Sequence, residues 1–313
     1  MKNRIFIYGY HGLRNIGAES RLIAIVNALR ALVPSAEIVV NSFHRTNLSY
    51  LRGATVDYFH PAAYRLAGRR RIGSADALVL SEGNMLTEAF TKHMLVACIT
   101  ALEQARSLGV PAIGLALDTG TISETRRERV VRALDSTALL TVRAPGAAQE
   151  LQALGVTHEL PVTADCAPSM PLPDDQERSR VRLRLGFDGA PVHAIAPVDF
   201  YMYPARMALV GRREDFVRWP FKATWPDDGR VRTERLVKTW ISYGLHILAS
   251  DPRARVALIV MDPSDIGIPQ RIREGIGRPE RTVLLAGADL TPPEMSAALG
   301  SCPRLLRPAI TLS

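Results

Sequence analysis

The chain has 313 residues, of which 47% are hydrophobic and 22% are charged, and its net charge is +8. This length predicts two domains of about 150 residues each, and the composition excludes a largely disordered chain. The excess of arginine favours anionic partners such as phosphorylated small molecules. Its scattered clusters lack interleaved aromatic residues and match no nucleic-acid-binding module, so we expect no nucleic-acid partner.

The cysteines and the apolar runs indicate the compartment. Cys98, Cys166 and Cys302 lie far apart without the spacing of a zinc site, which favours a reducing, cytoplasmic environment and no bound metal. The apolar run near the N-terminus is too short for a signal peptide. No segment reaches the ~18 apolar residues that span a bilayer. Peripheral association with the inner face of a membrane stays open.

A glycine-rich turn opens the chain. An apolar run at residues 5–7 precedes it and an amphipathic stretch up to Leu32 follows it, which predicts strand, turn and helix. Gly9, Gly12 and Gly17 permit positive φ and a close approach to the main chain. The N–H groups that open the following helix would favour an anion there. A tight turn without a ligand is the alternative.

Apolar segments then alternate with helical stretches, which predicts a largely parallel sheet. We expect strands at residues 36–41, 54–58, 75–80, 112–117 and 138–142, and helices at 88–108, 124–134 and 144–154. Polar residues stand where strands end: residues 81–84, Asp118, Arg143 and, after a short strand, Asp165. In parallel sheets these carboxyl ends are where ligands bind.

A proline-rich connector at residues 168–173 follows, so we place one domain at 1–175 and the other at 176–313. The second domain repeats the alternation, with strands at 192–198, 256–261 and 282–286 and helices at 231–248, 266–276 and 292–299. Residues 199–230 are rich in aromatics that either stack on a sugar or cover the core. Thr291 and Glu294 predict a capping box.

Four landmarks, taken in order, resemble the polysaccharide pyruvyl transferase family. They are the glycine turn at residues 9–19, the Ser-Glu-Gly-Asn turn at 81–84, the strand, arginine and helix unit around Arg143, and Val-Thr-Ala-Asp at 162–165. The resemblance runs from residue 4 to about 300. It implies an α/β fold with two Rossmann-like domains of the glycosyltransferase-B (GT-B) type. It also implies transfer of a pyruvyl group from phosphoenolpyruvate onto two sugar hydroxyls, forming a ketal in a cell-surface glycan or its lipid-linked precursor.

Two residues are candidates for catalysis. His11 is a candidate because it lies inside the glycine turn, where a histidine that only bonds its own backbone is the alternative. The resemblance implies an arginine after the first strand of the second domain, where Val198 and Asp199 stand instead, and Arg206 follows a few residues later. Phosphoenolpyruvate would be a co-substrate, and no cofactor or metal would be needed. The expected substrate-binding residues lie in the turns at strand ends: Gly12, Asn15, Gly17, Glu19, Ser81, Glu82, Gly83, Asn84, Asp118, Arg143 and Asp165.

The sequence departs from the family pattern in several places. Ala18 stands where the family has an aspartate, and Glu82 and Asn84 stand in place of glycines. The family's Arg-x-His motif, expected just past residue 300, has only Arg304 and Arg307 as counterparts, so we expect a second domain truncated at its C-terminus. Two alternatives stay open. One is a GT-B glycosyltransferase that uses a nucleotide sugar, and the other is an inactive glycan-binding relative.

Overall fold

The computed structural model describes residues 3–59, 63–81, 83–89, 92–187, 189–198, 206–208, 222–224, 229–302 and 304–306. The chain divides into two compact units. The first comprises Met1–Leu13 and Gly17–Met170, and the second comprises Arg14–Ile16 and Pro171–Ser313. The boundary predicted from the sequence, between residues 175 and 176, falls a few residues after this division.

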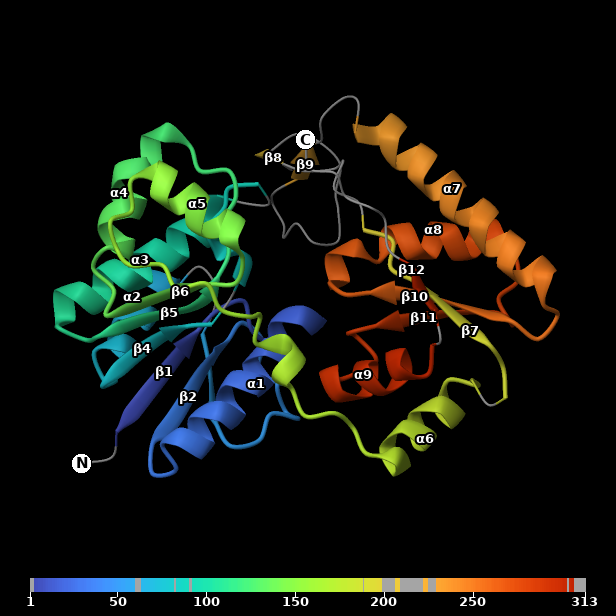
Figure 1. The fold of residues 1–313 in the computed structure, drawn as a ribbon, viewed down its shortest axis with the longest axis horizontal. Coiled ribbons are helices and arrows are strands. Elements are labelled where there is room, and N and C mark those ends of the chain that lie inside the picture. Colours follow the sequence, from blue (N-terminus) through green and yellow to red (C-terminus); the bar gives the residue numbers. More distant parts are fainter. Residues whose placement is uncertain are drawn as a thin grey trace. The chain divides into compact units, whose positions relative to one another are not determined.

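The first unit alternates strands and helices along the chain (Figure 1). Its elements are β1 (Arg4–Tyr8), α1 (Ile16–Leu32), β2 (Glu37–Ser42), β3 (Thr55–Tyr58), α2 (Tyr64–Ile72), β4 (Ala77–Leu80), the short 3-10 helix η2 (Gly83–Met85), α3 (Lys92–Leu108), β5 (Ala112–Leu117), α4 (Glu124–Leu134), β6 (Leu139–Val142), α5 (Pro145–Leu154) and η3 (Ala167–Ser169). The strands form one sheet in the order β3-β2-β1-β4-β5-β6, and every neighbouring pair is parallel. This is the Rossmann strand order.

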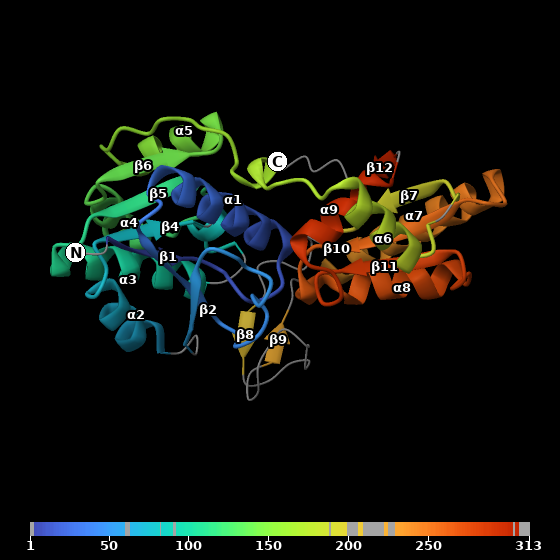
Figure 2. The same cartoon turned by 90° about the horizontal axis from the view of Figure 1, so that it is seen from below.

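Helices cover both faces of this sheet (Figure 2). On one face, Leu22 and Val26 of α1 pack with Ile7 of β1. On the other face, Leu102 of α3 and Leu134 of α4 share a core with the strands. Because both faces are buried, the strands read as continuous apolar runs in the sequence, as parallel strands do.

The second unit repeats the plan on a smaller scale. Its elements are α6 (Asp175–Arg184), β7 (Val192–Ile195), β8 (Arg206–Ala208), β9 (Lys222–Thr224), α7 (Gly229–Ser250), β10 (Arg255–Val260), η4 (Pro263–Asp265), α8 (Gly267–Ile276), β11 (Thr282–Ala286), α9 (Pro292–Gly300) and β12 (Arg304–Leu306). The parallel sheet has the order β11-β10-β7-β12, while β8 and β9 form a separate antiparallel pair. α7 and α8 pack on one face, and α6 and α9 on the other. The prediction of two Rossmann-like α/β domains is therefore confirmed.

Local predictions fared unevenly. The capping box of Thr291 and Glu294 is present at the start of α9. The helix expected from residue 88 is described as α3 from Lys92. The buried Glu88 carboxylate contacts the start of α4. It accepts the backbone N–H of Ser123 at 2.6 Å and lies 2.9 Å from the guanidinium of Arg126. Ser123 occupies the N-cap position of α4, but its own hydroxyl makes no capping bond.

The strand predicted at residues 162–165 is reduced to a single bridge between Val162 and Val142. None of the helices within the described ranges is both long and apolar enough to cross a bilayer.

Candidate functional site

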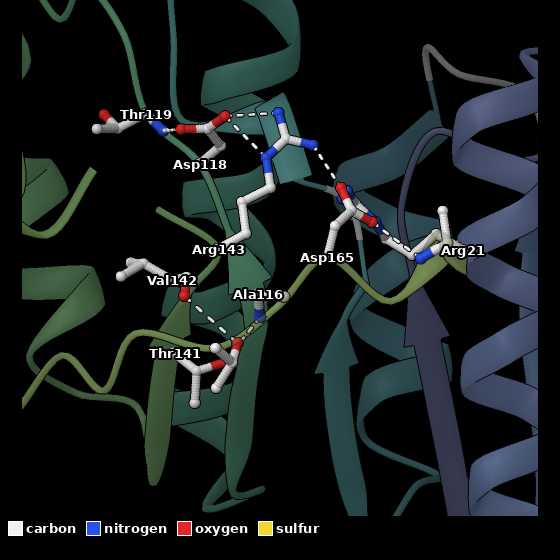
Figure 3. Close-up of polar contacts among 10 residues, drawn as sticks. Arg21, Ala116, Asp118, Thr119, Thr141, Val142, Arg143 and Asp165 are labelled. Atoms are coloured by element: carbon white, nitrogen blue, oxygen red, sulfur yellow. Dashed lines mark hydrogen bonds and ion pairs between the residues drawn. The ribbon is translucent and has the colours of Figure 1, made fainter. Parts of the chain in front are cut away.

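Four charged side chains meet where β5 and β6 end. Asp118 follows β5, Arg143 follows β6, Asp165 lies in the segment after α5, and Arg21 reaches in from α1. We call these four residues the arginine–aspartate cluster (Figure 3). Three of them were predicted as site residues from their positions after strands. The structure brings those three together at one edge of the first unit's sheet.

The cluster is a chain of alternating charges, as Figure 3 shows. Arg143 donates from Nε to Asp118 Oδ2 at 2.8 Å, with a second bond from Nη2 to the same oxygen, and from Nη1 to Asp165 Oδ2 at 2.8 Å. Arg21 also donates to Asp165, from Nη2 to Oδ2 and from Nε to Oδ1 at 3.3 Å. Two positive and two negative groups therefore balance.

Asp165 is fully occupied by protein donors. Its Oδ1 accepts from Arg21 Nε and from the backbone N–H of Ala167 at 2.9 Å, and its Oδ2 accepts from both arginines. These four bonds fill the ~4 acceptor positions of a carboxylate. Its partner Arg21 is only 4% exposed at the side chain. Asp165 therefore holds the two guanidinium groups in place.

Arg143 and Asp118 keep hydrogen-bonding capacity. The Arg143 guanidinium has ~5 N–H donors, and the three bonds above leave two of them without an acceptor among the described residues. Within the ranges that the structure describes, the Oδ1 of Asp118 accepts one bond, from the backbone N–H of Thr119 at 2.9 Å. The two side chains are 29% and 24% exposed, and Asp165 is equally accessible at 30% but has its acceptor positions filled. This pair is therefore the accessible part of the cluster with hydrogen-bonding capacity left for a polar ligand.

The charge balance also sets protonation. Burial alone would raise the pKa of Asp165, but the Ala167 N–H and the two arginines outweigh it and lower that pKa below the ordinary value of 3.8. Burial likewise works against the charge of Arg143, yet its bonds to Asp118 and Asp165 raise its pKa. Asp165 is thus ionised at neutral pH and cannot act as a general acid.

A bulge in β5 determines which residue stands beside Arg143. Ile113 and Gly114 pair with Leu139 and Leu140, but Leu117 pairs with Val142, so one extra residue is inserted. Ala116 carries this bulge at φ +49°, and its N–H donates to Thr141 Oγ1 at 2.7 Å. In an unbroken register the apolar Leu117 would stand next to Arg143. The bulge places Asp118 there instead, as bulges near functional sites commonly re-aim a side chain.

Gly83 gives the two arginines their room. A Cβ at this position would overlap Arg21 Nη1 and lie 2.9 Å from Arg143 Nη1. The backbone carbonyl of Gly83 also accepts the N–H of Asp118. Only glycine leaves this space open while its main chain contacts the end of β5.

His11 belongs to a second, buried group. The side chain of Asn41 accepts the Gly9 N–H at 2.8 Å and donates to the Gly9 carbonyl at 3.0 Å, which orients its amide. Oδ1 of Asn41 faces His11 Nδ1 at 3.1 Å, so Nδ1 carries the proton, and Nε2 accepts the hydroxyl of Ser81 at 2.9 Å. Burial lowers the pKa of His11 to about 4, and the charge of Arg21 adds to this effect. The imidazole is neutral at pH 7 with both nitrogens bonded.

The other predicted site residues are dispersed. Gly12 has φ +75°, and a Cβ there would overlap Ser42 Oγ. Asn15 falls in the second unit, where its amide donates to Asp262 Oδ2 at 2.8 Å. Gly17 lies in the first turn of α1, and the buried Glu19 accepts the hydroxyl of Tyr50.

Asn84, in η2, is half-buried. Arg206 lies in β8, Glu82 lies outside the described residues, and so does nearly all of the aromatic segment at 199–230. The roles assigned to His11, Arg206 and the substrate-binding residues stay predictions.

The sequence reading missed Arg21 and Asn41. Arg21 stands between Gly17 and Ile25 on the buried side of α1, and a charged residue on an apolar helix stripe is itself a signal. Asn41 follows three apolar residues at the end of β2, where a polar residue is likewise informative. In the described part of the chain, no three His, Cys, Asp or Glu side chains group closely enough to hold a metal ion.

Solved structures share this fold. MnaA of S. aureus, solved with UDP, is 12% identical, and the alignment covers 99% of this chain and 74% of that chain with a TM-score of 0.59. The UDP-GlcNAc 2-epimerase of Neisseria meningitidis, bound to UDP-GlcNAc, is 10% identical with coverages of 99% and 78% and a TM-score of 0.59. HepE of Anabaena, in complex with UDP, is 13% identical with coverages of 97% and 73% and a TM-score of 0.51.

These comparisons confirm the predicted two-domain α/β fold of the GT-B-like kind. No family model matches the chain, and no curated protein matches its sequence. The resemblance to polysaccharide pyruvyl transferases is wrong, because the similar structures include UDP-GlcNAc 2-epimerases and none of those described above is a pyruvyl transferase. The four landmarks behind it are strand, turn and helix units that any Rossmann-type sheet contains, so they reported the fold and not the chemistry. The phosphoenolpyruvate donor loses its support with it.

Proposed function

We propose that the chain is an enzyme that takes a sugar from a nucleotide sugar and transfers it to a glycan acceptor. One observation carries the proposal. Both units have parallel sheets that begin with the same Rossmann order, and at least 97% of the chain aligns with solved structures that hold UDP or UDP-GlcNAc. Likeness of fold alone does not determine the reaction, so the site residues have to supply the rest.

The Arg143–Asp118 pair of the arginine–aspartate cluster suits such a ligand. The two remaining N–H donors of Arg143 can bind a phosphate or a sugar oxygen, since a guanidinium recognises oxyanions through paired donors. The Oδ1 of Asp118 can accept a sugar hydroxyl. In this proposal Asp165 and Arg21 are positioning residues. Asp165 accepts a bond from Arg143 and so fixes the orientation of its guanidinium, and Arg21 holds Asp165 in place.

The first experiment measures binding by titration calorimetry with UDP, UDP-GlcNAc and ADP-glucose. Arg143→Lys keeps the positive charge but removes the paired N–H donors of the guanidinium. Since those donors would form charge-assisted bonds to the ligand, we expect the affinity for the nucleotide to fall by about tenfold to 100-fold. Arg129→Lys is the matched control. Arg129, on α4, donates from the same two nitrogens, Nε and Nη2, to Glu103 at 2.7 Å each, although it bonds both carboxylate oxygens whereas Arg143 bonds a single oxygen of Asp118. The control variant should bind like the wild type.

The outcomes separate the parts of the proposal. If none of the three nucleotides binds, the proposed function is overturned. If UDP-GlcNAc binds but the Arg143 and Arg129 variants behave alike, the function stands and the assignment of the cluster is wrong.

A second candidate reaction is epimerisation of the nucleotide sugar, which the similarity to UDP-GlcNAc 2-epimerases favours. Incubation with UDP-GlcNAc distinguishes the two by mass spectrometry and NMR. Transfer releases UDP only when an acceptor oligosaccharide is present. Epimerisation produces an isomeric UDP-sugar without any acceptor.

A further inference from the structure

The outer side of α2 carries arginines that form no ion pair with a carboxylate of the described residues, although the charge of Arg65 does act on Glu103 of α3. Arg65, Arg69 and Arg70 are exposed on this helix, and Arg106 is exposed at the end of α3, which packs beside it. None of these four forms an ion pair with a carboxylate in the described ranges. The fifth arginine here, Arg71, differs, because it grips Asp57 through two bonds of 2.6 and 2.9 Å.

An exposed leucine lies in the middle of this charge. Leu66 is 83% exposed, and Leu108 at the end of α3 is 37% exposed. Residues 65, 66, 69 and 70 share one side of α2 by their spacing of three and four, while Gly68 and Ile72 are buried on the opposite side. We call Arg65, Leu66, Arg69, Arg70, Arg106 and Leu108 the α2 face. The bond from Arg69 Nη1 to Ser107 Oγ, 2.9 Å, ties its two helices together.

We infer that the α2 face docks on an anionic lipid surface. Clusters of about four to eight arginines or lysines bind anionic headgroups through charge alone. The exposed Leu66 identifies lipid as the partner among polyanions, because a membrane has hydrocarbon beneath its phosphates and a polynucleotide does not. Glu103, the acidic residue on this part of α3, does not oppose the docking, since Arg129 already neutralises it.

Helix α6 supplies an internal control. It also carries exposed arginines and an exposed leucine, Leu183, at 72%. There, however, each of the three exposed arginines has a carboxylate partner: Arg178 with Asp175 at 2.6 Å, Arg180 with Glu177 at 3.5 Å and Arg184 with Glu294 at 2.9 Å. The fourth arginine of the helix, Arg182, is half-buried and donates to the carbonyl of Phe187. The two helices thus present the same residue types, balanced in one case and unbalanced in the other.

The test is flotation of the full chain with vesicles of phosphatidylcholine, with and without phosphatidylglycerol. We expect binding only to the anionic vesicles, and weaker binding at high salt. Each arginine near such a surface contributes about fivefold in affinity, so the triple variant Arg65→Gln, Arg69→Gln, Arg70→Gln should bind on the order of 100-fold more weakly. The triple variant of α6 at Arg178, Arg180 and Arg184 removes the same charge and should stay within about threefold of the wild type. Circular dichroism checks that both variants are folded.

Leu66→Ser should weaken binding to the vesicles by roughly tenfold, while Leu183→Ser should not change it. Two results would each overturn the inference: equal binding to neutral and anionic vesicles, or a loss of binding in the α6 triple variant equal to that in the α2 triple variant. A third would be binding to duplex DNA that the α2 triple variant loses, together with unchanged vesicle binding by Leu66→Ser. The inference is independent of the proposed nucleotide-sugar site, so each can fail without the other.

Discussion

Replacing Asp165 by asparagine tests whether the arginine–aspartate cluster is held together as described. The variant keeps the size of the side chain and one acceptor oxygen but removes the negative charge between Arg21 and Arg143. Removing one partner of a fully buried pair costs about 3–5 kcal/mol, whereas exposed pairs contribute about 0–1 kcal/mol. Arg21 is 4% exposed and Asp165 is 30% exposed. Since the pair lies between these limits, we expect a loss of about 2 kcal/mol in the free energy of unfolding.

Urea unfolding followed by circular dichroism measures this loss, with Glu128→Gln as the control. Glu128 also pairs with an arginine of the same unit, Arg132, but it is 84% exposed. Its variant should therefore stay within about 0.5 kcal/mol of the wild type.

The pH dependence gives a second readout. Because the folded chain lowers the pKa of Asp165, the stabilisation is present above the unfolded value of 3.8 and is lost as the pH falls through the lower folded value. The difference between wild type and variant should be constant at neutral pH and shrink below pH 3.8. A loss no larger than that of Glu128→Gln at pH 7, or a difference that grows as the pH falls below 3.8, would refute the reasoning.

Two further predictions concern the surroundings of the cluster. Gly83→Ala should lower the free energy of unfolding by about 1–3 kcal/mol in the same assay, because the new methyl group overlaps a guanidinium. The control Gly146→Ala, in α5, places its methyl group where no heavy atom lies within 4 Å and should be neutral or stabilising. Equal effects of the two substitutions would contradict the steric argument. His11→Gln should flatten the pH dependence of stability between pH 6.5 and about 4. In that pH range His11 is protonated in the unfolded chain but not in the folded one, so the free energy of unfolding of the wild type falls by up to about 1.4 kcal/mol per pH unit as the pH falls. An unchanged slope in the variant would show that His11 is not its source.

The fold was predictable because its signals are local. Strands buried on both faces appear as apolar runs, and the polar residues that follow them had to meet at one edge of a parallel sheet. Asp118, Arg143 and Asp165 were found in this way. Two helices were not predicted because they lack an apolar stripe: α2 has three consecutive arginines, and α6 is mostly charged, with Val181 and Leu183 as its apolar residues.

The rest of the site depends on tertiary contacts that no local pattern encodes. Arg21 is buried because Asp165, 144 residues away in sequence, neutralises it. The bulge at Ala116 is equally hidden, since alanine has no preference for positive φ. The chemistry was misread for a related reason, because the motifs that suggested pyruvyl transfer describe how a strand turns into a helix.

The backbone conformation of Ala116 lowers stability, and it is also what places Asp118 beside Arg143. An alanine held in the left-handed region costs about 1–2 kcal/mol relative to a relaxed conformation, and glycine would remove most of that penalty. Yet glycine would also let this stretch of backbone sample other shapes, including the one in which Leu117 replaces Asp118 as the neighbour of Arg143. Ala116→Gly should therefore make the protein more stable, but it would also loosen the geometry that places Asp118 beside Arg143.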